Sequence, residues 1–175
     1  MHEGYSKTRL TRLRRTGSVR ARGEHHTALE HVEDEHTMAE AGNEPKATIM
    51  IVEDQEVVRS LVADLLTNLS YGVVTAKDGQ EAVATYQRLM DEAREQDRQV
   101  HPIDLVILDM VLPNGGGEET FERLRQINPD VRVIISTGYD VDDRVHDILG
   151  RGAVGFLPKP YHIETLLNLV HKVLA

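Results

Sequence analysis

The segment Leu105-Val106-Ile107-Leu108-Asp109 decides the fold, because four bulky apolar residues run directly into a carboxylate. A short apolar run of this kind, bounded by polar residues, predicts a strand that is buried on both faces. Such strands are typical of a parallel sheet that is covered by helices on either side. The acidic residue that ends the run then stands at the edge of the sheet.

Four further apolar runs share this character, at residues 49–52, 73–74, 133–135 and 154–157. Between the runs, apolar residues recur at helical spacing. The first of these helical sets is Val58, Leu61, Val62, Leu65, Leu66 and Leu69. The last set is Ile163, Leu166, Leu167, Val170, Val173 and Leu174. Strand and helix therefore alternate five times, which predicts an α/β fold with a parallel sheet.

The composition indicates one domain of ordinary size. The 175 residues are 40% hydrophobic and 28% charged, with a formal net charge of −9 and no cysteine. The negative charge argues against a general nucleic-acid binder, and the lack of cysteine excludes disulfides, thiolate zinc sites and a cysteine nucleophile. The sequence contains neither an apolar run of about 18 residues nor a secretory signal, so we expect a cytoplasmic protein without a membrane span.

The N-terminal part of the chain has a different character. Residues 1–22 carry seven Lys or Arg and one acid, and residues 23–45 carry seven acids and no Lys or Arg. So few apolar side chains cannot offset the entropy of ordering. We therefore expect residues 1–45 to form a mostly disordered tail and residues 46–175 to form the folded domain. The tail histidines fit no recognised metal site and are expected to be solvated; they are His25, His26, His31 and His36.

Polar side chains follow the apolar runs. Glu53 and Asp54 come after the first run, Asp109 ends the third, Thr137 ends the fourth, and Lys159 follows the fifth. In open α/β sheets, ligands bind outside the carboxyl ends of the strands, so we expect these groups to share one rim. Three carboxylates repel one another, and a hard divalent cation such as Mg²⁺ would hold them together. One carboxylate would then attack a phosphoryl group and form an acyl phosphate, with the lysine neutralising the phosphoryl oxygens.

Taken together in this order, the motifs resemble a response-regulator receiver domain of two-component signalling. The resemblance covers about residues 46–175, and its motifs are Ile51-Val52-Glu53-Asp54, residues 105–113, Ser136-Thr137-Gly138 and Lys159-Pro160. It implies a flavodoxin-like (βα)5 fold, with a doubly wound, five-stranded parallel sheet of strand order 2-1-3-4-5.

The resemblance also implies a role for each acidic residue. Asp109 matches the phosphoacceptor of the family. Glu53, Asp54 and Asp109 match its Mg²⁺ ligands, and the backbone carbonyl of Val111 matches the further protein ligand. Glu53 stands where aspartate is more frequent, which keeps the charge. Lys159 matches the lysine that acts with the phosphoacceptor.

Three features match the parts of the family that change on activation. Thr137 matches the switch hydroxyl that moves toward the phosphoryl group. Phe156 matches the aromatic switch position, which is often tyrosine. The Lys159-Pro160 peptide bond matches one that is usually cis, and proline lowers the cost of that isomer. The glycine-rich stretch at residues 114–117 is expected to be a flexible loop.

The resemblance implies a phosphorylation-dependent switch rather than an enzyme that turns over outside substrates. A sensor histidine kinase or a phosphotransfer protein would donate the phosphoryl group. No output domain is expected after the fifth helix, so we expect no DNA-binding domain and an output through binding of an unidentified downstream protein. Residues 116–121 and 138–139 resemble receivers that are attached to hybrid sensor kinases. A homodimer through the fourth helix is left open.

Two alternative functions use the same residues. One is a binding scaffold that keeps the receiver fold and works without phosphorylation. The other is a phosphatase of the haloacid-dehalogenase type, which also places an aspartate after a buried strand. That class carries a second aspartate two residues later as its general acid, and Val111 occupies this position here. A P-loop nucleotide enzyme is excluded, because the sequence has no Gly-x-x-x-x-Gly-Lys-Ser/Thr motif.

Overall fold

The computed structural model describes residues 45–96, 101–113, 116–138 and 143–175. The expected disorder of residues 1–45 and the four tail histidines therefore lie outside the described residues, except for Pro45. In these described ranges, no helix combines the length and the apolar character needed to cross a membrane.

Strands and helices alternate along the described chain, as the apolar runs predicted. The elements are β1 (Thr48–Val52), α1 (Glu56–Asn68), β2 (Gly72–Ala76), α2 (Gly79–Glu95), β3 (Leu105–Asp109), α3 (Gly117–Ile127), β4 (Val133–Thr137), α4 (Asp143–Gly150), β5 (Gly155–Pro158) and α5 (Ile163–Leu174). The five strands pair in parallel in the order β2-β1-β3-β4-β5. The predicted fold class and strand order are therefore confirmed.

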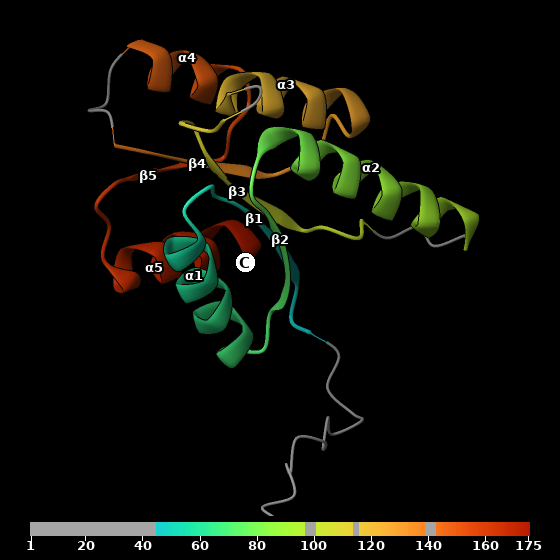
Figure 1. Ribbon diagram of the computed structural model, residues 1–175, viewed down its shortest axis with the longest axis horizontal. Helices are drawn as coiled ribbons and strands as arrows, with labels where there is room; N and C mark the ends of the chain where they lie inside the picture. Colours follow the sequence, from blue (N-terminus) through green and yellow to red (C-terminus); the bar gives the residue numbers. More distant parts are fainter. Residues whose placement is uncertain (1–44, 97–100, 114–115, 139–142) are drawn as a thin grey trace, which may run out of the picture. The chain divides into compact units, whose positions relative to one another are not determined.

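Helices cover both faces of the sheet (Figure 1). One core lies between the sheet and α2, α3 and α4, and it includes Val106, Leu108 and Phe121. The other core lies between the sheet and α1 and α5, and it includes Ile107 and Leu166. Successive strand residues alternate between the two cores because side chains of a strand point to opposite faces. Burying each large aliphatic side chain contributes about 1.5–3 kcal/mol, so the central strands stabilise the domain strongly.

Two details differ from the sequence prediction. Leu61 belongs to the apolar set of α1, but its side chain is 59% exposed, whereas Val62 and Leu66 are buried. The apolar stripe of α1 is wider than the strip that the sheet can cover, so its edge faces solvent. Val154 was expected within the last strand, but β5 begins one residue later. Its amide still donates to the Val133 carbonyl oxygen at 2.9 Å.

Candidate functional site

The polar residues that follow the strands gather at the carboxyl edge of the sheet. Glu53 directly follows β1, Asp109 ends β3, and Thr137 ends β4. β1 and β3 are neighbours in the sheet, and β4 is the next strand along. Because all the strands are parallel, their carboxyl ends meet at one edge, and the loops there are free to bind a ligand.

The three acidic side chains converge. One carboxylate oxygen from each of Glu53, Asp54 and Asp109 lies within 4.8 Å of the others. Glu53 and Asp109 are each only 4% exposed, whereas Asp54 is exposed to solvent. The cluster therefore has two buried members and one at its mouth.

Lys159 joins the two buried carboxylates. Its Nζ donates to Glu53 Oε2 at 2.6 Å and to Asp109 Oδ2 at 2.7 Å. Burial raises the pKa of Glu53 above its ordinary value, and Lys159 opposes this rise only in part. Burial by itself would lower the pKa of Lys159, but the hydrogen bonds to Asp109 and Glu53 outweigh it and raise that pKa. Lys159 is therefore firmly charged at neutral pH, and it offsets part of the negative charge around it.

Backbone contacts fix the carboxylates in place. The Val111 amide donates to Asp109 Oδ1 at 2.9 Å, so each oxygen of Asp109 accepts one hydrogen bond. The Gln55 amide donates to Glu53 Oε1 at 3.3 Å. Asp109 is thus oriented by its own loop and by a lysine from the far side of β4. Val111, whose carbonyl group the resemblance implied as a metal ligand, lies two positions after Asp109 in the loop that follows β3.

The two residues that the resemblance implied as the switch lie on β4 and β5, the strands that follow Asp109 along the sheet. Thr137 is buried at the end of β4, and its carbonyl oxygen accepts the Lys159 amide at 2.7 Å. Phe156 is half-buried and packs against the core that α2, α3 and α4 cover. The Lys159-Pro160 peptide bond is cis, as the resemblance implied.

Three residues that had no assigned role from the sequence also shape the site. The Arg59 guanidinium donates to the carbonyl oxygens of Glu53 and Asp54, at 2.7 and 3.2 Å, and so ties α1 to the acidic turn. Ser136 is buried beside Asp109 in the sheet. No sequence signal marks Arg59, since an arginine in a helix is common without such contacts, and Ser136 belongs to a motif of the resemblance in which it had no assigned role of its own.

Gly117 is the third such residue, and the glycine-rich loop was a signal for it. A Cβ atom on Gly117 would lie 2.4 Å from Met110 Cα and 2.5 Å from the Asp109 carbonyl oxygen. The glycine therefore permits a close approach of α3 to the backbone that follows Asp109, rather than only the flexibility that the sequence indicated. Residues 114–115 of that stretch lie outside the described ranges.

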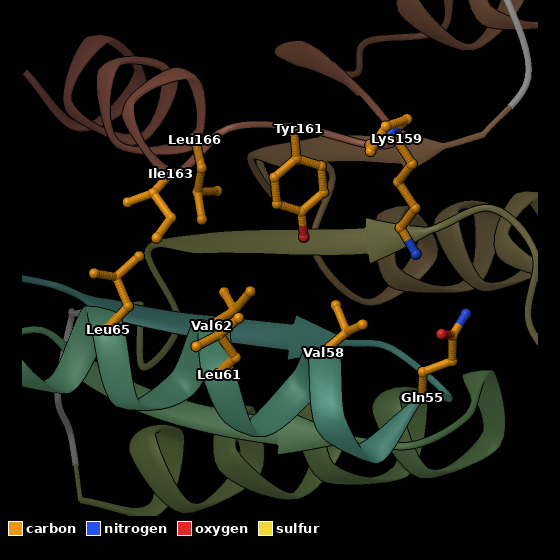
Figure 2. Close-up of a pocket in the computed structure, with 10 residues that line it drawn as sticks. Gln55, Val58, Leu61, Val62, Leu65, Lys159, Tyr161, Ile163 and Leu166 are labelled. Carbon is orange, nitrogen blue, oxygen red and sulfur yellow. The ribbon is translucent and has the colours of Figure 1, made fainter.

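An apolar cavity of about 450 Å³ adjoins the site between α1 and the segment that leads into α5. Its lining includes Val58, Leu61, Val62, Leu65, Tyr161, Ile163 and Leu166. Figure 2 shows the α1 side chains facing those of the α5 segment, with Lys159 and Gln55 at one end. The charged cluster thus borders a largely apolar surface.

The chemistry of the donor set fits a hard divalent cation. Three carboxylates converge here, whereas Lys159 contacts two of them and Arg59 contacts only backbone carbonyl oxygens of the same turn, so the carboxylates outnumber the neighbouring cations. Carboxylate oxygens are the ligands that Mg²⁺ prefers, and Asp54 leaves the cluster open to solvent, from which an ion and its waters can enter.

Residues 49–171 match the family that is described as response regulator receiver domain. The chain belongs to this family. The match reaches all five strands and all five helices of the described chain, from the second residue of β1 into α5, and the predicted resemblance is therefore confirmed. Receiver domains are phosphorylation-dependent signalling switches rather than classic enzymes, and they interact with histidine kinases or phosphotransfer proteins.

Several curated proteins resemble this receiver domain. The chain is 28% identical over 127 residues to the chemotaxis protein CheY of Bacillus subtilis, covering 72% of this chain and 96% of that protein. It is 30% identical over 128 residues to the sporulation initiation phosphotransferase F of the same species, covering 72% and 92%. It is also 30% identical over 128 residues to the sensor kinase CckA of Brucella abortus, covering 73% of this chain but 12% of that protein.

Solved structures agree with the receiver fold. A CheX-CheY-BeF3-Mg+2 complex from Borrelia burgdorferi matches with a TM-score of 0.65 and 25% identity, covering 74% of this chain and 90% of that one. The non-phosphorylated HemR receiver domain from Leptospira biflexa matches with a TM-score of 0.62 and 26% identity, covering 74% and 94%.

Proposed function

We propose that this receiver domain accepts a phosphoryl group on Asp109. The supporting observation is the short contact of Lys159 with both Asp109 and Glu53 at the carboxyl edge of the sheet. An Asp109 oxygen would attack the phosphorus, the bond from phosphorus to the donor would break, and an acyl phosphate would form. Lys159 would bind the phosphoryl oxygens and neutralise their charge as transfer proceeds.

A divalent cation completes the proposed site. The carboxylates of Glu53, Asp54 and Asp109, with the backbone carbonyl of Val111, would hold Mg²⁺, which supplies positive charge opposite the phosphoryl oxygens. The convergence of the three carboxylates supports this assignment. The similar CheX-CheY-BeF3-Mg+2 complex from Borrelia burgdorferi also supports it.

Thr137 and Phe156 are the proposed switch. The Thr137 hydroxyl would bind the phosphoryl group once it is on Asp109, and Phe156 would turn further into the core that α2, α3 and α4 cover. Phe156 is half-buried, so an inward turn would bury more of its ring. The surface around α4 and α5 would then repack and change its affinity for a partner.

The experiment that tests phosphorylation uses acetyl phosphate and Mg²⁺ with the full chain. We expect phosphate incorporation into the wild type and into Asp130→Asn, an exposed acid after α3, but not into Asp109→Asn. A chelator should abolish incorporation into the wild type and into Asp130→Asn. Equal incorporation into Asp109→Asn and the wild type would refute the assignment.

We propose a sensor histidine kinase or a phosphotransfer protein as the donor. The apolar cavity beside Lys159 supports this, together with the exposed side chains of Leu61 (59%) and Ile163 (50%) in its lining and of Val57 (81%) elsewhere on α1. A helix of a donor protein would bury these side chains while it presents a phosphohistidine to Asp109.

A substitution on this surface tests donor binding separately from phosphate uptake at Asp109. Leu61→Glu should slow transfer from a phosphorylated phosphotransfer protein by about tenfold or more, since an exposed hot-spot side chain contributes about 1–2 kcal/mol to binding. It should leave uptake from acetyl phosphate unchanged, because Leu61 is exposed and does not contact Asp109. The control is Val154→Glu, which changes an exposed residue before β5. If Leu61→Glu slowed both transfer from the phosphotransfer protein and uptake from acetyl phosphate, while Val154→Glu slowed neither, the substitution would have damaged the site itself.

We propose that residues 46–175 act as a single-domain response regulator with residues 1–45 as a tail, and that the output is binding of a downstream protein in the cytoplasm. The coverage of 96% and 92% of two curated relatives supports a single domain. The chain spans only 12% and 24% of two others, the sensor kinase CckA and the transcriptional regulator NtrC of Azospirillum brasilense. A binding partner that distinguishes phosphorylated from unphosphorylated protein would support the switch, and equal binding to both forms would favour the scaffold.

A further inference from the structure

Ser136 lies beside the proposed phosphoacceptor in the sheet. The register of β3 and β4 pairs Asp109 with Ser136, and that of β4 and β5 pairs Ser136 with Leu157. Neighbouring strands are about 4.8 Å apart, and paired residues of parallel strands point to the same face. The Asp109 and Ser136 side chains therefore stand in one row, on the face that α1 and α5 cover.

Lys159 reaches over this row. It follows β5, yet its Nζ contacts Asp109 at the end of β3 and Glu53 after β1. β4 lies between β5 and β3 in the sheet, so the lysine side chain crosses the end of β4. On the face where it crosses, the β4 residue in the row is Ser136.

The Ser136 hydroxyl is buried and has no partner in the part of the chain that the structure describes. The residue is 2% exposed, and its Oγ makes no hydrogen bond. Both Asp109 oxygens are already engaged, one by the Val111 amide and one by Lys159. Burying a hydroxyl without a partner costs free energy that an alanine would not. A hydroxyl at this position makes physical sense if it gains a partner in another state of the site.

We propose that Ser136 donates a hydrogen bond to the Asp109 carboxyl group when Asp109 is phosphorylated, and that this bond shortens the lifetime of the acyl phosphate. The inference rests on the proposed function. Phosphorylation offers Lys159 new oxygens to bind on the phosphoryl group, which draws the ammonium away from the carboxyl oxygen that it holds. The neighbouring hydroxyl of the row is then the group that replaces it.

The hydrogen bond acts on the leaving group of hydrolysis. A water oxygen bonds to phosphorus, the bond from phosphorus to the Asp109 oxygen breaks, and its electron pair stays on the carboxylate. The two protons of the water leave with the product as dihydrogen phosphate. A donor that is already aimed at the carboxyl group stabilises the negative charge as it develops there, so it speeds this step.

The test compares Ser136→Thr with Ser136→Val in the full chain. The two variants match in shape, but only threonine keeps the hydroxyl. Each protein is phosphorylated with acetyl phosphate and Mg²⁺, the donor is removed, and the loss of protein-bound phosphate is followed. We expect the acyl phosphate of Ser136→Val to last roughly three to ten times longer than that of Ser136→Thr, the effect of one hydrogen bond to a developing charge.

A second measurement separates this role from a structural one. Without a phosphodonor, Ser136→Val should be at least as stable to denaturant as Ser136→Thr, because the hydroxyl has no partner to lose. Ser136→Ala, which adds no atoms, gives the same comparison with the wild type if the larger side chains prevent folding. A lower stability of the hydroxyl-free variants would show a structural hydrogen bond and overturn the inference.

The remaining outcomes are also decisive. Equal lifetimes in the hydroxyl-bearing and hydroxyl-free proteins, when both incorporate phosphate, overturn the inference and leave the proposed function intact. Absence of Asp109-dependent incorporation into the wild type overturns both.

Discussion

The ammonium group of Lys159 lies 2.6 Å from a Glu53 oxygen and 2.7 Å from an Asp109 oxygen, and these two carboxylates are almost completely buried. The positive charge of Lys159 thus compensates the negative charges of Glu53 and Asp109, which have little contact with water. Loss of that charge leaves both carboxylates buried without compensation, which is one of the more costly changes in a folded protein. A replacement of Lys159 therefore tests the charge balance directly.

We expect Lys159→Met to lower the free energy of unfolding by roughly 3 kcal/mol at pH 7, the usual cost of removing one partner from a buried ion pair. Asp109→Asn in the same background should restore part of this loss, because it removes one of the two opposed charges. Urea unfolding in the presence of a chelator measures both effects. Additive losses in the double variant would contradict this account.

The loss of unfolding free energy in Lys159→Met should depend on pH. The pKa of Glu53 is raised by burial, so the folded protein binds this proton more readily than the unfolded chain does. Its contribution to stability is therefore present at low pH and is lost as pH rises through the folded-state pKa. Without Lys159 that pKa rises further, so the deficit of Lys159→Met should shrink as pH falls from 7. A deficit that is constant with pH would argue against an electrostatic cause.

At the scale of elements, α3 begins against the backbone that follows Asp109. The Gly117 amide donates to the Met110 carbonyl oxygen at 3.2 Å, and a Cβ atom on Gly117 would meet backbone atoms at 2.4 and 2.5 Å. Backbone atoms cannot rotate away as a side chain can. The start of α3 and the position of Asp109 are therefore coupled.

We expect Gly117→Ala to lower the free energy of unfolding by roughly 1–3 kcal/mol, the cost of overpacking, and to slow uptake of phosphate from acetyl phosphate. Gly150→Ala, at the end of α4, is the matched control, because nothing lies within 4 Å of its Cβ position. Chemical denaturation and the phosphate assay measure the two effects. A fully active and stable Gly117→Ala would show that α3 can shift without disturbing Asp109.

The elements were largely predictable because the signals were local. Continuous apolar runs such as residues 105–108 mark strands that are buried on both sides, and the residue that ends each run marks the edge of a parallel sheet. The positions of Glu53, Asp54, Asp109 and Lys159 at one edge follow from that rule once the strands are parallel.

The remaining features depend on packing that a sequence does not encode locally. The spacing of apolar residues in α1 does not tell which side of a wide stripe the sheet covers, so the exposure of Leu61 was not foreseen. The close approach at Gly117 depends on where α3 lies relative to β3. The contacts of Arg59 and the unpartnered hydroxyl of Ser136 depend on neighbours that the chain brings together only when it folds.

At the scale of the whole molecule, the three carboxylates at the carboxyl edge of the sheet carry negative charge that a bound cation can neutralise. We expect Mg²⁺ at 100 times its dissociation constant to add about 2.7 kcal/mol to the free energy of unfolding, because an ion that binds only the folded protein stabilises it by mass action. Asp54→Asn should remove most of this gain. Thermal unfolding with and without Mg²⁺ measures it, with sodium chloride at matched ionic strength as the control. An equal rise in melting temperature with both salts would indicate screening rather than a bound ion.

Glu53 and Lys159 are 106 positions apart in the chain, and Asp109 lies between them. A ribosome makes these residues in that order, so a nascent chain carries both buried acids long before it carries the amine that balances them. Until β5 joins the sheet, Lys159 does not compensate the two carboxylates, so burying them side by side is unfavourable. Under the proposed function, competence to take up a phosphoryl group therefore requires that β5 and Lys159 have been made, and a chain interrupted before β5 would not accept phosphate on Asp109.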